Sequence, residues 1–511
     1  MSLLSSVLSV TLLATLCLIF KWRKAHSVVT QRRLYPPGPT TRSWIFGNAG
    51  DISVETQCDR YTEWYRKYGD VTYFRIFKEH FILVSSHEAA VEFFEKRSKN
   101  YSTRPFSMMA QLMGWNFPTS FKPYGEQWRA ERRLLQHHFK PDAMPSYHAI
   151  QTRQVNIMLQ RLLTEPDEFR NHIRNLAGAI IMSTVYGYDI APKDDPYVKI
   201  AETATSKLGE AMFPGASPVN VLPFLRYFPD WFPGCGFHQS ARDTKVVIDA
   251  MLNEPIASVQ ERIKRGINDP CIASQLLSNQ DVSIESQVVK NVCSTIYAAG
   301  YDTTISAVAT FFYAMANFHD VQLKAQTEIE SVIGTDRLPS FDDRATLPYV
   351  EALFRELLRW QPVVPFSLFH AASEEDAYNG YHIPKGATII PNIRAMTRDP
   401  SRYMEPEIFN PSRFLKLDGT LNDDDVQYVF GFGRRICPGR YFASDTVWLS
   451  IVRVLFLFDI QRKKDAFGNY TALDSGYGTG LVAHPLPFEC TISPRPRIDK
   501  QIILDSIAEE L

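Results

Sequence analysis

The sequence predicts a mainly α-helical protein with a small β region, preceded by one N-terminal transmembrane helix. Three observations lead to this fold class. Apolar residues recur at helical spacing in eight long stretches of the chain. Two short runs rich in β-branched and aromatic residues near the start of the body are typical of a hairpin. The first twenty residues carry no charged side chain, and about twenty apolar residues can span a bilayer.

Residues 1–20 are expected to be a membrane anchor. Lysines and arginines follow within residues 21–33, and the positive-inside rule then leaves the rest of the chain in the cytosol. A cleaved secretory signal, the alternative, would carry its charge before the apolar run and small residues after it. Residues 36–39 read PPGP, which cannot be helical. We therefore expect a basic flank and hinge over residues 21–40 and a single body over residues 41–511.

The expected elements of the body follow in chain order. A hairpin over residues 71–76 and 81–84 comes first. Helices are then expected at 126–139, 149–164, 171–187, 241–264, 285–318, 320–333, 347–360 and 438–457. Residues 213–237 combine five prolines with many aromatic residues. Two interpretations stay open for that segment: a packed hydrophobic loop, or a surface that enters lipid beside the anchor.

Composition excludes several classes of protein. With 45% hydrophobic residues the chain can bury a large core, so it is not a disordered protein. Its 55 basic and 56 acidic residues nearly cancel, so we expect no nucleic-acid partner. The seven cysteines form no C-x-x-C pair, which argues against a zinc finger and a disulfide framework.

The stretch around Cys437 is the most informative part of the chain. Residues 430–439 read FGFGRRICPG, and a helical run follows. The cysteine is therefore expected at the N-terminal end of a helix, where the helix dipole and N–H donors stabilise a thiolate. Gly433 and Gly439 would let the backbone approach a bulky planar ligand. The alternative for a lone cysteine is an inert core residue.

Five residues match every fixed position of the motif F-x-x-G-x-R-x-C-x-G: Phe430, Gly433, Arg435, Cys437 and Gly439. On these residues the chain resembles the cytochrome P450 haem-thiolate enzymes. The resemblance implies the cytochrome P450 fold and haem b as the cofactor. It implies that Cys437 is the axial ligand of the haem iron, that Phe430 packs near the sulfur, and that Arg435 meets a haem propionate. Thiolate ligation favours O–O cleavage, which explains a cysteine in this place.

A second motif lies in the middle of the longest helical stretch, where residues 299–304 read AGYDTT. A glycine and two threonines are costly inside a helix, and a threonine hydroxyl can bond the carbonyl one turn back. We therefore expect a distorted, interrupted helix here. The stretch matches the oxygen-binding A-G-x-D-T-T element of the family. The match implies that Thr303 and Asp302 deliver protons and that Ala299 and Gly300 leave the gap for dioxygen.

Three further residues are candidates for haem contacts. Trp128 and Arg132 lie four apart on one helical face and match the family's W-x-x-x-R pattern, which implies contacts with the propionates. A core tryptophan beside a solvated arginine is the alternative. His370 occupies the position where many members of the family have arginine. A strand histidine with an internal partner is the alternative there.

Glu356 and Arg359 share one face of the helix expected at 347–360 and can pair. Residues 411–414 read PSRF, where the family usually has P-E-R-F, and they supply Arg413. The resemblance implies that Glu356, Arg359 and Arg413 together hold the scaffold around the haem.

The resemblance implies a monooxygenase that uses O2 to oxidise a small lipophilic metabolite. Several stretches, such as WFPGCGF at 231–237, are similar to fungal secondary-metabolite members of the O-methylsterigmatocystin oxidoreductase type. No G-x-G-x-x-G fingerprint or phosphate-binding loop occurs in the chain. Electrons are therefore expected from another protein, and the resemblance implies that it is an NADPH–cytochrome P450 reductase, with cytochrome b5 as a second candidate donor. The family implies a single-pass protein in the lipid of the endoplasmic reticulum membrane, with its catalytic domain in the cytosol.

Two other functions stay open at this point. A haem-thiolate enzyme can rearrange or dehydrate its substrate without O2, although such members commonly lose the threonine that this chain keeps at 303. A non-catalytic haem-binding protein would need no proton relay. By position in the family, the walls of a substrate pocket are expected from residues 105–117, Tyr297, Ala298, Val363–Phe366 and Tyr477. Their apolar character favours a terpenoid, a polyketide or a fatty-acid-like molecule.

Overall fold

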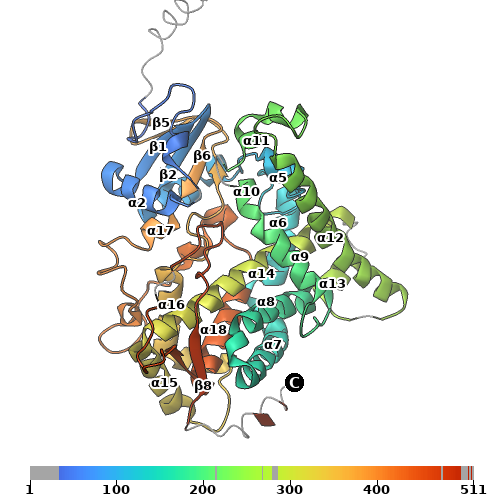
Figure 1. Cartoon of the computed structure of the whole chain (residues 1–511), viewed down its shortest axis with the longest axis vertical. Helices are drawn as coiled ribbons and strands as arrows, with labels where there is room; N and C mark the ends of the chain where they lie inside the picture. The colour runs from blue at the N-terminus through green and yellow to red at the C-terminus, as the bar shows by residue number, and fades with distance from the viewer. Residues whose placement is uncertain are drawn as a thin grey trace, which may run out of the picture.

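Helices make up most of the structure, and a small sheet occupies one end of it (Figure 1). This computed structural model describes residues 34–53, 55–212, 216–267, 269–278, 286–473, 476–496, 504, 505 and 508. The mainly helical fold with a small β region is confirmed over this part of the chain. The anchor expected at 1–20 and its basic flank up to residue 33 lie outside the described residues. Of the helices that are described, none is both long and apolar enough to cross a bilayer.

Ten helices of eleven or more residues form the body of the described chain: α2 (Gln57–Tyr68), α6 (Glu126–Phe139), α7 (Pro145–Thr164), α8 (Phe169–Tyr186), α9 (Pro196–Ser206), α12 (Phe237–Lys264), α14 (Ser286–Asn317), α15 (His319–Ile333), α16 (Pro348–Trp360) and α18 (Arg440–Leu457). The shorter helical elements that the site uses are α5 (Met108–Leu112), α11 (Pro218–Val221), α17 (Ile393–Met396), the π-helix η2 (Glu92–Lys96) and the 3-10 turns η7 (Pro411–Phe414) and η9 (Gly433–Arg435). Each of the eight expected helices is present, and no end differs by more than four residues.

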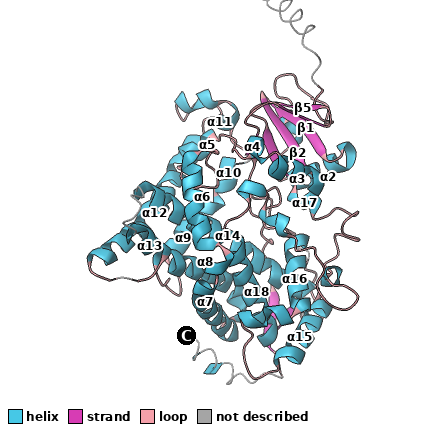
Figure 2. Cartoon of the chain, turned by 180° about the vertical axis from the view of Figure 1, so that it is seen from behind, coloured by secondary structure: helices cyan, strands magenta, loops and turns pink. Residues whose placement is uncertain are grey.

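The main sheet has the strand order β1-β2-β6-β3. The expected hairpin forms its first pair, β1 (Val71–Ile76) with β2 (Glu79–Val84), and the strands are antiparallel. Strand β6 (Thr388–Pro391) joins β2 in parallel, and β3 (His370–Ala371) joins β6 in antiparallel fashion. Two smaller sheets pair β4 (Asp376–Tyr378) with β5 (Tyr381–Ile383) and β7 (Phe458–Arg462) with β8 (Cys490–Pro494). Seen from behind, the strands of the main sheet gather beside α2, α3 (His87–Val91) and α17 (Figure 2).

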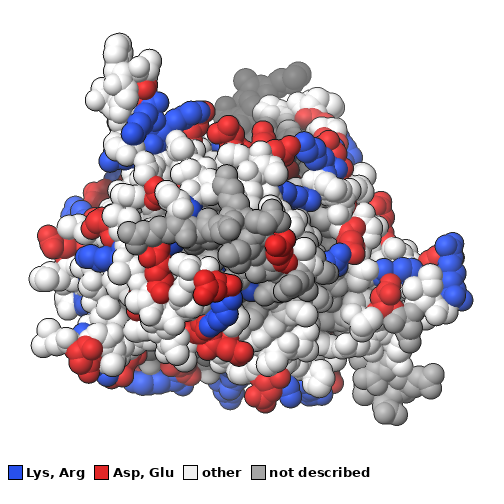
Figure 3. All heavy atoms as spheres, turned by 90° about the horizontal axis from the view of Figure 1, so that it is seen from below, with Lys and Arg blue, Asp and Glu red and all other residues white. Residues whose placement is uncertain are grey.

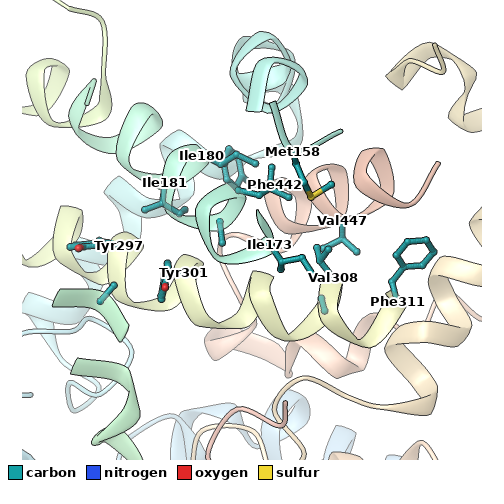
Figure 4. Packing of buried hydrophobic residues seen from close by; sticks show 14 of the residues in the cluster. Met158, Ile173, Ile180, Ile181, Tyr297, Tyr301, Val308, Phe311, Phe442 and Val447 are labelled. Atoms are coloured by element: carbon teal, nitrogen blue, oxygen red, sulfur yellow. The ribbon is translucent and has the colours of Figure 1, made fainter. Parts of the chain in front are cut away.

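Helix α14 is the central helix of the molecule: α8 and α18 pack against it, and α7 packs against α8 and α18 (Figure 4). Most of its residues are buried. Helix α8 crosses it closely at Gly300, where an added Cβ would lie 2.4 Å from Cδ1 of Ile181. A residue larger than glycine at position 300 would require the end of the Ile181 side chain to shift, because packed interiors leave little room for an extra methyl group.

Charged side chains of both signs are interspersed on the face of the molecule seen in Figure 3. The segment around α11 is part of residues 213–237, for which a packed loop and a lipid-entering surface were both considered. Val219, Leu225 and Cys235 are buried, whereas Tyr227 is 75% exposed and Trp231 is 81% exposed. One side of this segment therefore packs on the body, and the other side presents aromatic rings outward.

Candidate active site

Cys437 lies in a closed turn between η9 and α18. Its N–H donates to the carbonyl of Phe430 at 2.8 Å, and Nη1 of Arg440 donates to the carbonyl of Cys437 at 3.1 Å. Helix α18 begins at Arg440, two residues later than expected, and Pro438 lies in the turn before it. The backbone bonds hold the sulfur in one place at the N-terminal end of the helix.

The protein alone does not favour the Cys437 thiolate. Burial raises the pKa of the thiol, and the N–H of Gly439 and the charges of Arg132 and Arg440 lower it by less. The Gly439 N–H at the helix end acts in the expected direction, toward the thiolate, but desolvation of the buried sulfur outweighs it. A coordinated metal ion would deprotonate the thiol outright. The side chain is partly accessible although burial dominates its pKa, as expected of a group that faces an internal space.

The two glycines of the motif have different roles. Gly433 has a φ of +50°, and a Cβ there would lie 2.3 Å from the carbonyl oxygen of Phe94 in η2. This glycine therefore lets the cysteine turn pack on the π-helix, whereas we expected it to make room for a ligand. At Gly439 a Cβ would meet nothing within 4 Å, so the space beside it is open. Only Gly439 fits the expected role.

Arg435 is buried and holds the cysteine turn to the segment before α6. Its Nε donates to the carbonyl of Ser102 and its Nη2 to the carbonyl of Lys122, both at 2.7 Å. Its guanidinium also lies over the ring of Trp128, 4.3 Å from the centroid. Trp128 is therefore a buried residue that contacts Arg435, and the W-x-x-x-R pattern places α6 against the cysteine turn.

Two more arginines lie near Arg435. Nη2 of Arg132 donates to the carbonyl of Ile436 at 2.6 Å, while its Nε is buried without a partner. Arg104 donates through Nη1 to the carbonyls of residues 368 and 369, at 2.7 and 2.8 Å. No motif identified Arg104 in the sequence. The one sign of its role is that it precedes a proline in a loop that has no acidic residue nearby to pair with it.

Burial lowers the pKa of all three arginines, and the neighbouring positive charges lower the pKa of Arg104 and Arg435 further. Burial, then Arg435 and Arg132, lower the pKa of Arg104 well below its usual value. Burial, then Arg132, lower the pKa of Arg435 to about 9. Within the described chain none of the three forms an ion pair with an acidic side chain. Buried cations without a counter-charge are costly, so this cluster fits an anionic group that the protein itself does not supply. The two carboxylates of a haem are such a group.

His370 lies on β3 beside this cluster. Its Nδ1 is 2.6 Å from the carbonyl of Tyr101 and must donate, because a carbonyl only accepts. Burial, then Arg104, lower the pKa of His370 well below its usual value. The bond to Tyr101 gives His370 the internal partner of the alternative interpretation, and it does not engage Nε2, so a contact of His370 with the haem stays a prediction.

The middle of α14 presents an open face. Ala299 is exposed and Thr303 is partly exposed, although the helix around them is buried. Oγ1 of Thr303 donates to the carbonyl of Ala299 at 2.7 Å, which is the expected bond one turn back. The expected interruption is absent, because α14 runs unbroken through these residues. Gly300 packs on Ile181 of α8, so the open space lies on the face of Ala299 and Thr303.

Asp302 has a hydrogen-bond partner that is distant in the sequence. Nε2 of His484 lies 3.0 Å from Oδ1 of Asp302. The two residues are separated by 182 positions, and no motif connects them. Only the fold could reveal this pair.

Glu356, Arg359 and Arg413 meet as expected. Glu356 and Arg359 have fully buried side chains joined at 2.6 and 2.9 Å, and Nε of Arg413 lies 3.2 Å from Oε1 of Glu356. The N–H of Asn410 donates to the same oxygen at 2.7 Å. Nη1 of Arg359 donates to the carbonyls of residues 397 and 406, both at 2.8 Å. The triad thereby fastens α16 to η7 and to the chain after α17.

The residues expected in the pocket walls fall into two groups. Tyr297 donates to the carbonyl of Tyr197 in α9, and Tyr477 packs edge-on against Tyr313. Tyr297 is a core residue, whereas Tyr477, Val363 and Val364 are only partly buried. The loop after α16 and the segment at Tyr477 are thus the better candidates for a pocket wall.

Comparisons with known proteins agree with this geometry. The family model described as "Cytochrome P450" matches residues 36–490. "Cytochrome P450 monooxygenase COX2" of Coprinopsis cinerea is 37% identical over 92% of this chain and 91% of its own length. "Cytochrome P450 monooxygenase 208" of Postia placenta is 37% identical over 95% of this chain and 94% of its own. "Cytochrome P450 monooxygenase ppsD" of Aspergillus oryzae is 36% identical over 92% and 90%.

Proposed function

We propose a function from the premise that this chain belongs to the cytochrome P450 family, the haem-thiolate monooxygenases whose cofactor is haem b with a cysteine ligand. The enzyme oxidises, most simply hydroxylates, a small lipophilic molecule with O2 and electrons from a redox partner. It acts in fungal secondary metabolism. The observation that carries the proposal is a buried arginine cluster without a counter-charge, next to the Cys437 turn.

Bound haem b supplies the activation of dioxygen. Cys437 is its thiolate ligand, and the backbone bond to Phe430 keeps the sulfur from moving away from the metal. Arg104, Arg132 and Arg435 bind the propionates, and Trp128 supports Arg435 through the cation–π contact. Each arginine also bonds backbone carbonyls, so its side chain is preorganised for the anion.

Thr303 and Asp302 handle protons on α14. The Thr303 hydroxyl donates its hydrogen bond to the carbonyl of Ala299. Its oxygen can therefore accept a hydrogen bond from a water molecule. Asp302 lies one residue earlier and is partly exposed, so it can take protons from solvent and pass them toward Thr303. The retained threonine favours monooxygenation over a rearrangement without O2.

The substrate is small and apolar. The partly buried Val363 and Val364, with Leu112 of α5 and Ala298 of α14, offer hydrocarbon surface. A terpenoid, a polyketide or a fatty-acid-like molecule matches such a lining.

The enzyme is a single catalytic domain over residues 41–511, held at the cytosolic side of the endoplasmic reticulum membrane by an anchor at residues 1–20. Exposed aromatic rings support the proposal that one end of the molecule faces lipid. These rings are Trp44 and Phe46 beside the β1–β2 turn, and Tyr227 and Trp231 after α11. The sheet and α11 lie at the same end of the molecule (Figure 1). Aromatic residues favour the interface of a bilayer.

NADPH–cytochrome P450 reductase supplies the electrons, with cytochrome b5 as a second donor. The test is to combine the full-length protein with that reductase and NADPH in yeast microsomes, add a panel of lipophilic metabolites, and identify products by mass spectrometry. Products that carry one oxygen atom from ¹⁸O2 support the proposal. Products formed without NADPH or without ¹⁸O incorporation would favour rearrangement. The Cys437→Ala variant is the control, and it should lose both the products and the carbon monoxide difference spectrum of thiolate-bound haem.

A further inference from the structure

Residues 476–486 form a hairpin-like segment, which we call the C-terminal hairpin. It lies between β7 and β8 in the chain and reaches back to α14. The N–H of Gly478 donates to the carbonyl of His484 at 2.8 Å, so its two arms are bonded together. Nε2 of Gln57, a buried residue of α2, donates to the carbonyl of Thr479 at 3.1 Å. The hairpin is therefore fixed to a second element near its tip.

Two adjacent residues of the hairpin contact two residues of α14 one turn apart. Nε2 of His484 lies 3.0 Å from Oδ1 of Asp302, and Oγ of Ser306 donates to the carbonyl of Ala483 at 2.6 Å. Asp302 and Ser306 are four residues apart, so they share a face of the helix. The N–H of Ala483 donates to the carbonyl of Val363 at 2.9 Å. The backbone that carries the His484 ring is thus held on three sides.

The contact is asymmetric for Asp302. Its carboxylate accepts a hydrogen bond at Oδ1 from a ring whose place the backbone fixes. Among the residues that the structure describes, Oδ2 has no hydrogen-bond partner. The Asp302 side chain is 22% exposed and that of His484 is 34% exposed, so water reaches the pair without surrounding it. A carboxylate held by one oxygen keeps one rotamer and leaves its other oxygen to exchange protons.

We propose that His484 is a positioning residue for Asp302: it fixes Oδ1 and so leaves Oδ2 turned to the proton path along α14. The inference rests on the proposed function, in which Asp302 passes protons toward Thr303. His484 does not itself carry the proton in this proposal. Its effect comes from donating one hydrogen bond, which an amide of similar reach can also donate.

The first experiment compares four full-length variants with reductase and NADPH. His484→Leu removes the donor, His484→Gln keeps an N–H at similar reach, and Asp302→Asn removes the carboxylate. His319→Leu is the matched control, because His319 faces Asp459 at 3.6 Å in a remote histidine–aspartate contact. We expect His484→Leu and Asp302→Asn to slow NADPH consumption about 3- to 10-fold. This is the change in rate that corresponds to the loss of one partly exposed hydrogen bond to a charged group. His484→Gln and His319→Leu should stay near the wild-type rate.

The second experiment does not depend on activity. The melting temperature of the protein is measured for His484→Leu, for Asp302→Ala, which removes the acceptor that asparagine would keep, and for the double variant. If the two side chains act through one hydrogen bond, the loss in the double variant is smaller than the sum of the single losses. Additive losses would overturn the pairing. The carbon monoxide difference spectrum should be unchanged in all three proteins, which shows that the haem site is intact.

The outcomes separate the inference from the proposed function. A slow Asp302→Asn with a normal His484→Leu overturns the role of His484 and leaves the proposed proton path standing. A normal Asp302→Asn overturns the proton path itself. If His484→Gln is as slow as His484→Leu, an ionisable ring is required, and the positioning role is wrong. Slow His484→Leu with recovery in His484→Gln supports it.

Discussion

Removing the carboxylate of Glu356 should be among the most destabilising single changes in this protein. Its two oxygens accept four hydrogen bonds, at 2.6, 2.7, 2.9 and 3.2 Å, from Arg359, Asn410 and Arg413. The side chains of Glu356 and Arg359 are fully buried. Glu356→Ala leaves the Arg359 cation buried without its partner, which costs about 3–5 kcal/mol. A folded protein is stable by only about 5–15 kcal/mol, so little stability would remain.

The chain offers a closely matched control. Arg60 and Glu63 are also three residues apart and also lie 2.6 Å from each other, but their side chains are 37% and 57% exposed. Glu63→Ala should therefore cost less than about 1 kcal/mol. The two pairs differ in burial, not in spacing or distance.

The assay is urea unfolding of both full-length variants, followed by circular dichroism, together with the yield of haem-loaded protein from the carbon monoxide difference spectrum. Adding Arg359→Met to Glu356→Ala should not restore stability, because the carbonyls of residues 397 and 406 then lose their donor. A free energy of unfolding for Glu356→Ala within about 1 kcal/mol of that for Glu63→Ala would refute the burial argument.

Four further predictions address the site and its support. Thr303→Ala should retain carbon monoxide binding but divert electrons into hydrogen peroxide, measured as product and peroxide formed per NADPH; unchanged ratios would remove the hydroxyl from the mechanism. Arg104→Gln should speed the transfer of haem to an excess of an apo-haem protein by roughly tenfold or more, since a hydrogen bond to a charged group contributes about 1.5–3 kcal/mol; an unchanged rate would separate Arg104 from the propionates. Gly433→Ala should lower the melting temperature through a strain of about 1–3 kcal/mol at its φ of +50°, whereas Gly439→Ala, with open space beside it, should not; equal melting temperatures would contradict this. Burial, then His137, lower the pKa of His138 to about 4 from 6.5, so the unfolded chain binds a proton that the native state does not, and stability should fall as the pH drops from 6.5 toward 4. His138→Gln should flatten that dependence of the melting temperature, and an equally steep dependence would exclude His138 as its cause.

Much of the fold could be predicted from the sequence because the long helices bury wide apolar faces. Helix α16 is an example, since its apolar residues form a continuous stripe and its ends were predicted to within one residue. Helix α2 was missed because only Gln57, Tyr61 and Trp64 are buried in it, which is too few for a helical pattern. Helix α9 was missed because it packs through Val198 and small alanines, whose spacing is a weak signal.

The site was predictable only where a motif is local. The residues of the cysteine turn and of the α14 motif are close in sequence, so their spacing identified them. Arg104 and His484 act through contacts with segments that are distant in the sequence, and a local sequence pattern cannot predict such contacts. The helix-end donor at Cys437 could be predicted, but the larger effect of desolvation on its pKa could not, because desolvation depends on everything packed around the thiol.

The close crossing of α8 and α14 limits how this enzyme can be evolved in the laboratory. Even alanine at Gly300 brings its methyl carbon to 2.4 Å from Cδ1 of Ile181, so the end of that side chain has to shift before the residue fits. Shortening that side chain to valine removes the δ carbon, so a paired library over both positions offers residue 300 more room than a library of that codon alone. Substitutions at this crossing should therefore be epistatic, and a search for altered activity near the open face of α14 has to sample the two codons together.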